Sequence, residues 1–323
     1  MTEYLTRRVL QMIPLLLFIS VLSFLIAEFT PGDPVLMYLA PAKRGLSTEE
    51  LDLLRHQLGL DRPVYVRYFS WLTNLLEGNW GYSLKTNNTV LNEITARLPN
   101  TIILGALSFA FTIIVAIPVG VLSAIKRYTL IDYFITVVAF IGISMPSFFL
   151  ALILIELLSN QFHILPSVGM STLGIKMGSW EAFWDVCKHL ILPVITLSFT
   201  SIGNWSRYQR ATLLEVMNQD YVRTARGKGL KERLVIWRHG FRNSLIPVIT
   251  LAGLSLPDLV NGAYITETVF GWPGMGRLGI TAIQVRDYPI VMGVTMLSAL
   301  LVVVGNLLAD ISYAVVDPRI RHK

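Results

Sequence analysis

The chain has few charged residues and only one cysteine. Lys, Arg, Asp and Glu make up 15% of its 323 residues, and 53% are hydrophobic, whereas soluble domains carry about 25% charged residues. A soluble protein of this composition could not cover its surface with polar side chains, so we predict an integral membrane protein. The single cysteine, Cys187, excludes an internal disulfide and gives no support to thiol redox chemistry.

The sequence also lacks the short motifs that carry common chemistries. It contains no G-x-x-x-x-G-K-[ST] stretch for nucleotide phosphates, no H-E-x-x-H or Cys/His cluster for a metal, and no G-x-S-x-G. Its five histidines are scattered. We therefore expect no catalytic residue, no metal site and no cofactor in this chain, and we do not predict an enzyme.

The net charge of +6 could indicate a protein that binds nucleic acid, but the pattern of the charges argues against it. Lys and Arg cluster between long apolar runs, which is the pattern that sets the topology of membrane proteins. The expected partner is therefore a lipid bilayer.

Six apolar runs are long enough to be membrane spans. At about 1.5 Å rise per residue, some twenty residues cross the hydrocarbon core of a bilayer. The first run exceeds the apolar core of a secretory signal and lacks a good cleavage site, so we expect it to be retained. The six predicted spans are Val9–Phe29, Thr101–Ile125, Tyr133–Leu158, Leu190 to about Ser206, Leu245 to about Thr268, and Tyr288 to about Val316.

The basic residues predict the sidedness. Nine Lys and Arg lie in the segment from Arg207 to Arg242, and others lie at both ends of the chain. Because basic residues are enriched in cytoplasmic loops, we expect this segment and both termini to face the cytoplasm. The region 30–100 is also charged, but loops longer than about 60 residues cross the membrane largely regardless of charge. We predict helices in it at Ser47–Leu58 and Val64–Leu76, with aromatic residues resting at the membrane interface. A peptide-binding role for these aromatics is the alternative.

Two polar residues fall in the middle of the fifth predicted span. Asp258 and Asn261 lie beside Pro257 and Gly262, where a helix is expected to be irregular. Polar groups within a membrane either serve function or bond a neighbouring helix. We expect Asp258 and Asn261 either to line a translocation path or to join two helices.

The basic segment from Leu213 to Pro247 is too charged to lie in lipid and too regular for a slack linker. Leu213, Met217, Tyr221 and Ala225 recur every four residues, which predicts one helical face. The glycines of Gly227-Lys228-Gly229 then allow a sharp turn. The segment is either a solvated basic loop that only fixes topology or a short helix presented to a cytoplasmic partner.

The motif DYVRTARGKGL from Asp220 to Leu230, followed by Arg242-Asn243-Ser244-Leu245-Ile246-Pro247, resembles the cytoplasmic loop of ABC importer permeases. It is most similar to the peptide/nickel branch. Pro31-Gly32-Asp33-Pro34, the stretch Val269–Arg277 and Asp317-Pro318-Arg319 resemble further signatures of the B-type subunit of dipeptide and oligopeptide permeases. The resemblance covers nearly the whole chain.

The resemblance implies an all-α membrane protein with the type I ABC importer permease fold: six transmembrane helices and an external helical insertion between spans one and two. We divide the chain into 1–29, an extracytoplasmic region 30–100, and a five-helix core 101–323 that includes a coupling loop 207–244. The implied location is the cytoplasmic (inner) membrane of a bacterium or archaeon. The implied partners are a second, similar permease in a heterodimer, two ATPase subunits that use ATP and Mg²⁺, and an extracytoplasmic substrate-binding protein.

The resemblance also implies roles for particular residues. The residues expected to couple to the ATPase are Asp220, Tyr221, Val222, Arg223, Thr224, Ala225, Arg226, Gly227, Lys228 and Gly229. Those expected to meet the binding protein are Trp80, Tyr82, Phe270, Trp272 and Arg277. Gly229→Pro or Ala225→Arg is expected to uncouple ATP hydrolysis from uptake without unfolding the protein.

Three alternatives stay open at this point. The same machine could carry nickel chelates, glutathione or oligosaccharides instead of peptides. From other classes, the chain could be a self-sufficient secondary carrier, or a membrane scaffold or receptor that transports nothing. The sequence shows no regular chain of intramembrane charges of the kind that an ion-driven carrier tends to need.

Overall fold

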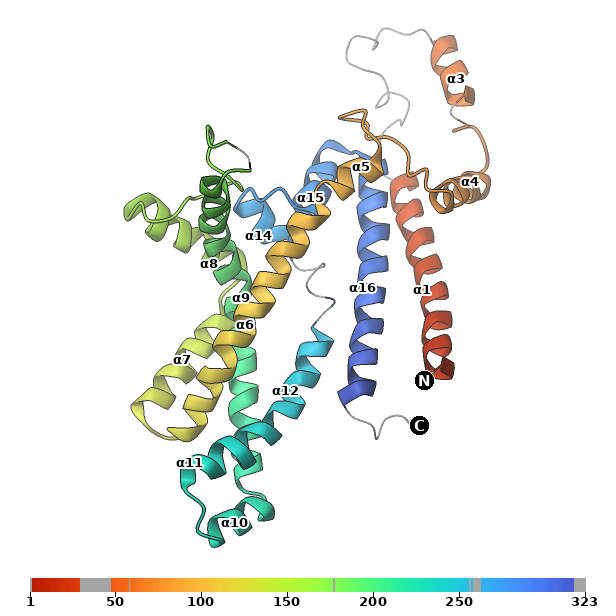
Figure 1. Ribbon diagram of the computed structural model, residues 1–323. Helices are drawn as coiled ribbons and strands as arrows, with labels where there is room; N and C mark the ends of the chain where they lie inside the picture. Colours follow the sequence, from red (N-terminus) through yellow and green to blue (C-terminus); the bar gives the residue numbers. More distant parts are fainter. Residues whose placement is uncertain are drawn as a thin grey trace. The chain divides into compact units, whose positions relative to one another are not determined.

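The computed structural model describes residues 2–29, 48–57, 59–176, 178–255, 257 and 263–316. These residues are helical apart from turns and one isolated β-bridge between Tyr82 and Thr89, with no strand within the described ranges (Figure 1). The chain forms two compact units. Unit 1 lies within residues 1–98 and 278–301, and unit 2 within 99–277 and 302–323.

Unit 1 contains the first long helix and most of the region that follows it. Its elements are α1 (Thr2–Phe29), α3 (Thr48–Gln57), α4 (Val64–Leu76), α5 (Val90–Thr95) and the first half of α16 (Tyr288–Val316). α4 packs on α1 through Phe24, which lies 5.6 Å from the ring of Tyr68 and 5.8 Å from that of Trp71. The Arg67 guanidinium pairs with Glu28 at 2.5 Å. The predicted helices at Ser47–Leu58 and Val64–Leu76 are confirmed as α3 and α4, although the two end residues of the first, Ser47 and Leu58, lie outside the described residues.

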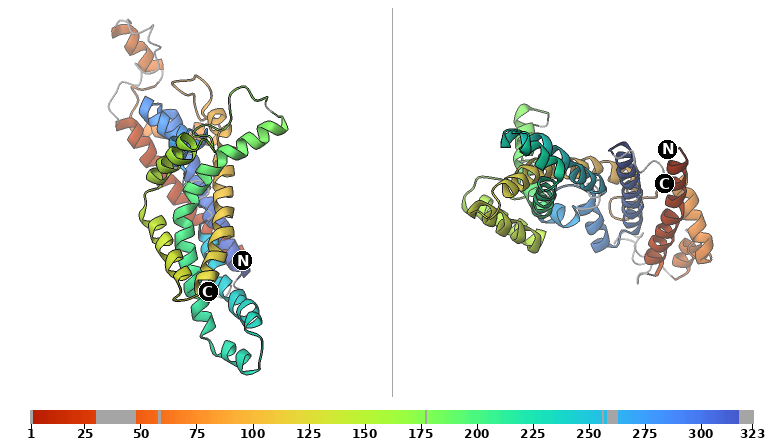
Figure 2. Two further views of the ribbon diagram at one scale, coloured as in Figure 1. Left: turned by 90° about the vertical axis from the view of Figure 1, so that its left-hand side faces the viewer. Right: turned by 90° about the horizontal axis from the view of Figure 1, so that it is seen from below.

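Unit 2 is a bundle around one long helix, α9. Its elements are α6 (Leu98–Ile125), α7 (Leu130–Ser144), α8 (Ser147–Leu154), the π-helix η2 (Ile155–Gln161), α9 (Trp180–Met217), α10 (Asp220–Gly227), α11 (Glu232–Leu234), the π-helix η3 (Val235–Phe241), α12 (Arg242–Leu254), α14 (Tyr264–Val269) and the start of α15 (Met275–Val285). α9 continues past the turn between α6 and α7 to the α10 segment, at the lower end of unit 2 in Figure 1 and in the left-hand view of Figure 2.

Small residues let the helices of unit 2 approach α9 closely. A Cβ atom on Gly120 of α6 would lie 2.5 Å from the Ser206 carbonyl oxygen, and one on Gly203 would lie 2.7 Å from that of Ala139 in α7. Thr200 donates a hydrogen bond of 3.0 Å to the Gly142 carbonyl oxygen. Such contacts through small residues are typical of helices that pack within a membrane.

Four described helices have the length and hydropathy of membrane spans, and a bent pair raises the number to five. The four are Leu10–Phe29, Val90–Ile125, Trp180–Met217 and Tyr288–Ala309. The predicted third span is not straight: α7 and the helix from Ser147 to Gln161 meet at 109° beside Pro146, where proline excludes a helical hydrogen bond. The predicted fifth span is described as α12, which ends at Leu254, and α14, with 258–262 between them outside the described residues.

Candidate functional site: the α9–α12 loop

The segment that the sequence marked as a coupling loop is a compact group of short helices. α9 ends at Met217, and α10 begins at Asp220 after two connecting residues. Val222 and Ala225 of α10 are buried against Val235 and Met217. The predicted face with a spacing of four is therefore wrong beyond Met217. The chain breaks after α9, and Val222 rather than Tyr221 joins Ala225 on the buried side.

The other face of α10 is open to solvent. Tyr221 is 45% exposed, and the side chain of Arg223 is 74% exposed. Asp220 lies in the first turn with its side chain 98% exposed, where a carboxylate complements the positive end of the helix. Thr224 bonds the Asp220 carbonyl oxygen at 2.9 Å. α10 thus presents one tyrosine and several charged groups, while its apolar residues hold it to the bundle.

The sharp turn after α10 depends on Gly229. Its φ angle is +76°, in the left-handed region that glycine adopts without steric cost. The Gly229 N–H donates to the Arg226 carbonyl oxygen at 2.9 Å. The Arg226 guanidinium then bonds Glu232 at 2.9 and 3.2 Å across the turn, and this contact lowers the pKa of the Glu232 carboxyl. The predicted break at these glycines is confirmed.

The burial of Ala225 changes what an arginine there would do. Ala225 is only 5% exposed, so a long cationic side chain at this position would displace the packing of α10 on Val235 and Met217. Ala225→Arg is therefore expected to disturb the fold of the loop itself. The exposed residues Tyr221 and Arg223 are the better probes of a partner.

We predict opposite outcomes for two glycines of the turn. Gly229→Ala forces a left-handed residue and costs about 1–2 kcal/mol, and Gly229→Pro fails outright because proline requires φ near −65°. A Cβ atom on Gly227 meets no atom within 4 Å, so Gly227→Ala should be tolerated within the chain. Thermal unfolding of the purified variants measures the difference. Equal stability of G227A and G229A would contradict the role of the left-handed turn.

A basic and apolar surface continues beyond the turn. The residues around its shallow groove are Gly229, Leu230, Lys231, Arg233, Leu234, Trp237 and Arg238. Trp237 is 50% exposed and contacts the ring of Phe241 at 5.2 Å. The apolar side chains of Leu230, Leu234 and Trp237 are all exposed here.

Sequence reasoning missed an ion pair in unit 2 that is built on a buried carboxylate. Asp132, in the first turn of α7, is 3% exposed. Its two carboxylate oxygens accept bonds from Nε and Nη2 of Arg210 in α9, both at 2.9 Å. Ser123 Oγ and the Tyr128 N–H, the latter at 2.9 Å, donate to the same carboxylate. The available signal was an aspartate at a helix start and an arginine 78 positions later, which no spacing rule connects.

A second buried contact joins α9 to α12 beside the first. Gln209 Nε2 donates to Ser244 Oγ at 2.9 Å, and Ser244 Oγ donates to the Phe241 carbonyl oxygen at 2.9 Å. Gln209 and Ser244 are both fully buried. Two consecutive residues of α9 therefore bind different helices, because Gln209 bonds α12 and Arg210 bonds α7.

The residues expected along the translocation path lie outside the described residues. Asp258 and Asn261 belong to the segment 258–262, so their role stays a prediction. Within the described ranges, no group of three or more His, Cys, Asp or Glu side chains is arranged to hold a metal ion.

The residues expected to meet a binding protein fall into two groups, one in each unit. In unit 2, Phe270 and Trp272 are 2% and 0% exposed, and Trp272 Nε1 donates to the Asn100 carbonyl oxygen at 3.0 Å. Arg277 is exposed and its guanidinium bonds the Gly271 carbonyl oxygen. The two aromatic rings therefore support this loop from inside, and Arg277 is the member at its surface.

A buried glutamate fixes the same loop. Glu267 of α14 is 0% exposed. It accepts bonds from Thr101 Oγ1 at 2.7 Å and from the Arg277 N–H at 2.9 Å. A Cβ atom on Gly274 would lie 2.3 Å from its carboxylate, so glycine is required for the loop to wrap around Glu267. The sequence analysis did not single out Glu267.

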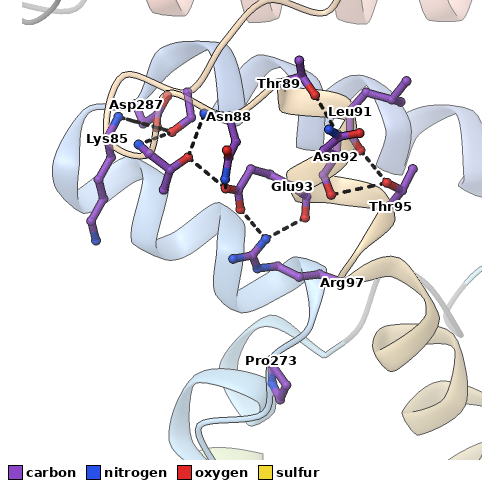
Figure 3. Close-up of polar contacts among 12 residues, drawn as sticks. Lys85, Asn88, Thr89, Leu91, Asn92, Glu93, Thr95, Arg97, Pro273 and Asp287 are labelled. Atoms are coloured by element: carbon purple, nitrogen blue, oxygen red, sulfur yellow. Dashed lines mark hydrogen bonds and ion pairs between the residues drawn. The ribbon is translucent and has the colours of Figure 1, made fainter.

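In unit 1, Tyr82 is 59% exposed and Trp80 is half-buried. Asp287 holds the following loop by accepting bonds from Ser83 Oγ and from the N–H groups of Leu84 and Lys85. Figure 3 shows this contact beside a second one, in which Glu93 accepts from Asn88 and Arg97. The exposed tip is thus built on two carboxylates.

We predict that Asp287→Ala loosens this loop. The buried Ser83 hydroxyl and the partly buried Leu84 N–H lose their acceptor, at a cost of about 1–3 kcal/mol for each group left unsatisfied, whereas the Lys85 N–H keeps a bond to Ser83 Oγ. Amide hydrogen exchange at Leu84 and Lys85 should accelerate, while Asp52→Ala at an exposed position of α3 should leave it unchanged. Unchanged exchange in D287A would contradict the anchoring role.

Unit 1 also contains a cavity of about 550 Å³ that no motif predicted. Its walls come from the ends of α1 and α16 and from α4, and it combines Arg62 and Arg67 with Trp71 and Trp80. Arg67 is already paired with Glu28.

Comparison with known proteins places the chain. Residues 116–322 match the family described as "Binding-protein-dependent transport system inner membrane component", and residues 1–105 match the family of its N-terminal region. The oligopeptide transport system permease protein AppB of Bacillus subtilis is 44% identical over 323 residues, which is all of both chains. The dipeptide permease DppB of Escherichia coli K12 is 38% identical over 340 aligned residues, and the glutathione permease GsiC of the same strain is 35% identical over 323, again with both chains fully covered.

These relatives are membrane permeases and not enzymes, which confirms the resemblance to ABC importer permeases. Permeases of this kind work with ATPase subunits and a binding protein. The matches together cover nearly all of the chain. The chain therefore belongs to the family of binding-protein-dependent transport system inner membrane components.

Proposed function

We propose that the chain is the membrane permease subunit of an ATP-driven importer for peptides. The observation that carries the proposal is similarity over the full length to an oligopeptide permease at 44% and a dipeptide permease at 38% identity. ATP hydrolysis, with Mg²⁺, takes place in two partner ATPase subunits, in keeping with the lack of a P-loop in this chain. The chain itself provides part of the path and responds to the ATPases.

The α10 segment receives the movement of an ATPase. Its exposed face carries Tyr221, Arg223 and Lys228, while Val222 and Ala225 hold it to the bundle. A short helix presented in this way fits a groove on a partner. ATP-driven closure of the two ATPases then moves α10, and packed helices carry the movement as a rigid body.

The extracytoplasmic side receives a binding protein loaded with substrate. Tyr82 in unit 1 and Arg277 in unit 2 are its exposed contacts, and Trp80, Phe270 and Trp272 support the two loops from within. Asp258 and Asn261 line the path between the two sides. A second, similar permease completes the path as a heterodimer, and six spans place both termini in the cytoplasm.

Sidedness is tested by labelling single cysteines. Cys187 is the one native cysteine, so a Cys187→Ser background accepts one new thiol at a time. An impermeant maleimide added to intact spheroplasts should label Tyr82→Cys and should label Lys228→Cys only after the membrane is opened. Labelling of K228C in intact spheroplasts would overturn the proposed orientation.

The assembly is tested by purifying the tagged chain in mild detergent from its own cells and identifying what accompanies it. Two ATPases, a second permease and a binding protein are expected, and the ligand retained by the binding protein identifies the cargo. A bound peptide confirms the proposal. A bound nickel chelate or oligosaccharide would leave the proposed ATP-driven importer in place but would change its substrate. Bound glutathione would also change the substrate, and the similarity to the glutathione permease GsiC favours it over the other two. A chain with no ATPase, active with an ion gradient alone in liposomes, would support a secondary carrier.

A further inference from the structure

Movement of the α10 segment must pass through few connections to reach the rest of unit 2. Two residues join α10 to the end of α9, and the buried side of α10 contacts Val235 at the start of η3, which leads into α12. α6 and α7 have no covalent link to α10 except through α9. How the α6–α7 hairpin follows α10 therefore depends on how firmly it is fixed to α9.

The other α7–α9 contacts are packing contacts and single polar contacts. The Phe199 ring of α9 packs on Gly142 of α7, and Ile143 of α7 packs on Gly203 of α9. Thr200 donates one hydrogen bond of 3.0 Å to the Gly142 carbonyl oxygen. None of these contacts has the charge-assisted, two-bond geometry of a paired guanidinium and carboxylate.

The ion pair between Asp132 and Arg210 is specific to one register. The guanidinium meets both carboxylate oxygens at 2.9 Å through Nε and Nη2, a planar two-bond arrangement that fits only one relative position. The carboxylate is held in turn by Ser123 of α6 and by the Tyr128 N–H of the α6–α7 turn. One carboxylate therefore fixes α6, the turn and α7 to one residue of α9.

The neighbouring contact fixes α9 on its other side. Gln209 bonds Ser244 of α12 at 2.9 Å, one residue before Arg210. α9 is thus held at the same level by the hairpin and by α12, between the α10 segment and the close contacts of the bundle.

We propose that Asp132 and Arg210 are the positioning pair that makes the α6–α7 hairpin follow α9, so that displacement of α10 moves the bundle as one body. This inference rests on the proposed function, because the displacement comes from partner ATPases. Without the pair, the hairpin slips along α9, and ATP hydrolysis continues while import falls.

The test uses Asp132→Asn together with Arg210→Gln in the complete complex in liposomes. The double substitution removes both charges, so no charge is left buried without a partner. The matched control is Arg207→Gln, one turn earlier on α9, whose cation lies 4.3 Å from the centre of the Phe140 ring of α7 but joins no buried carboxylate. Arg210→Lys keeps the positive charge but loses the two-bond geometry. If the double variant does not assemble, this single variant tests the proposal instead.

Import per ATP hydrolysed should fall about tenfold in D132N/R210Q, within the usual range of coupling free energies, while stimulated ATP hydrolysis persists. R207Q should retain the ratio of the unsubstituted complex, and R210K should lie between. An assembled D132N/R210Q or R210K complex with an unchanged ratio would overturn the inference. Absence of ATP-driven uptake in the unsubstituted complex would instead overturn the proposed function.

A distance measurement separates slippage from a general loss of structure. Spin labels at Lys126→Cys in the turn and Glu215→Cys in the last turns of α9, both exposed positions, are introduced into the Cys187→Ser background. The distance between them should be the same in nucleotide-free and ATP-bound complexes. In D132N/R210Q it should change on ATP binding. A distance that stays constant in the variant would show that the ion pair is not needed to keep the α6–α7 hairpin fixed to α9.

Discussion

Asp132→Ala is expected to lower the free energy of unfolding by about 1.5–3 kcal/mol, because a buried carboxylate with charge-assisted bonds is lost while Arg210, whose side chain is 28% exposed, can turn to solvent. Arg210 would keep its charge while losing both of its 2.9 Å bonds. Ser123 and the Tyr128 N–H would lose their acceptor as well. Denaturation of the purified chain in mixed detergent micelles, followed by tryptophan fluorescence, measures the loss.

Two companion variants make this result specific. Asp220→Ala removes a carboxylate whose side chain is 98% exposed and should change stability by no more than about 0.5 kcal/mol. D132N/R210Q should recover much of the loss, because no charge remains without its partner, and a double-mutant cycle would report strong coupling between the two positions. A D132A chain as stable as D220A would show that the pair contributes nothing to the fold.

Glu267→Ala is the second substitution with a large expected effect, a loss of at least about 3 kcal/mol from unsatisfied donors and a new cavity. The carboxylate is fully buried and accepts from Thr101 and from the Arg277 N–H. Without it, these donors have no acceptor in the interior. The loop from Phe270 to Arg277 should lose its fixed conformation, and uptake that depends on the binding protein should fall with it.

The contact with Gly274 gives an independent check. A Cβ atom on Gly274 would lie 2.3 Å from the Glu267 carboxylate, so Gly274→Ala should reproduce the loss seen in E267A from the opposite side. Glu215→Ala, at an exposed position of α9, is the control with the same change of residue type. Thermal unfolding compares the three. Wild-type stability in both E267A and G274A would contradict the central place of Glu267 in this loop.

Local sequence patterns were enough to predict several elements. The helix at Val64–Leu76 follows from its amphipathic pattern, and the turn at Gly229 follows from a residue that adopts positive φ freely. The long apolar runs predicted a membrane protein, and most of them are helices of sufficient length. Periodicity was misleading at Tyr221, because a spacing of four continued through residues 218–219, where the helix breaks.

By itself, the sequence determined that this chain is a helical membrane protein with a basic loop, because composition and apolar length can be read from short segments, and its motifs resembled those of importer permeases. Only the tertiary structure decided which residues join the helices to one another. Asp132 meets Arg210 across 78 positions, and Thr101 meets Glu267 across 166. Phe270 and Trp272 lie in the interior although their loop resembles a surface motif. The reason is physical: a buried carboxylate needs donors that fit its oxygens, and the donors come from whichever helices the packing brings beside it.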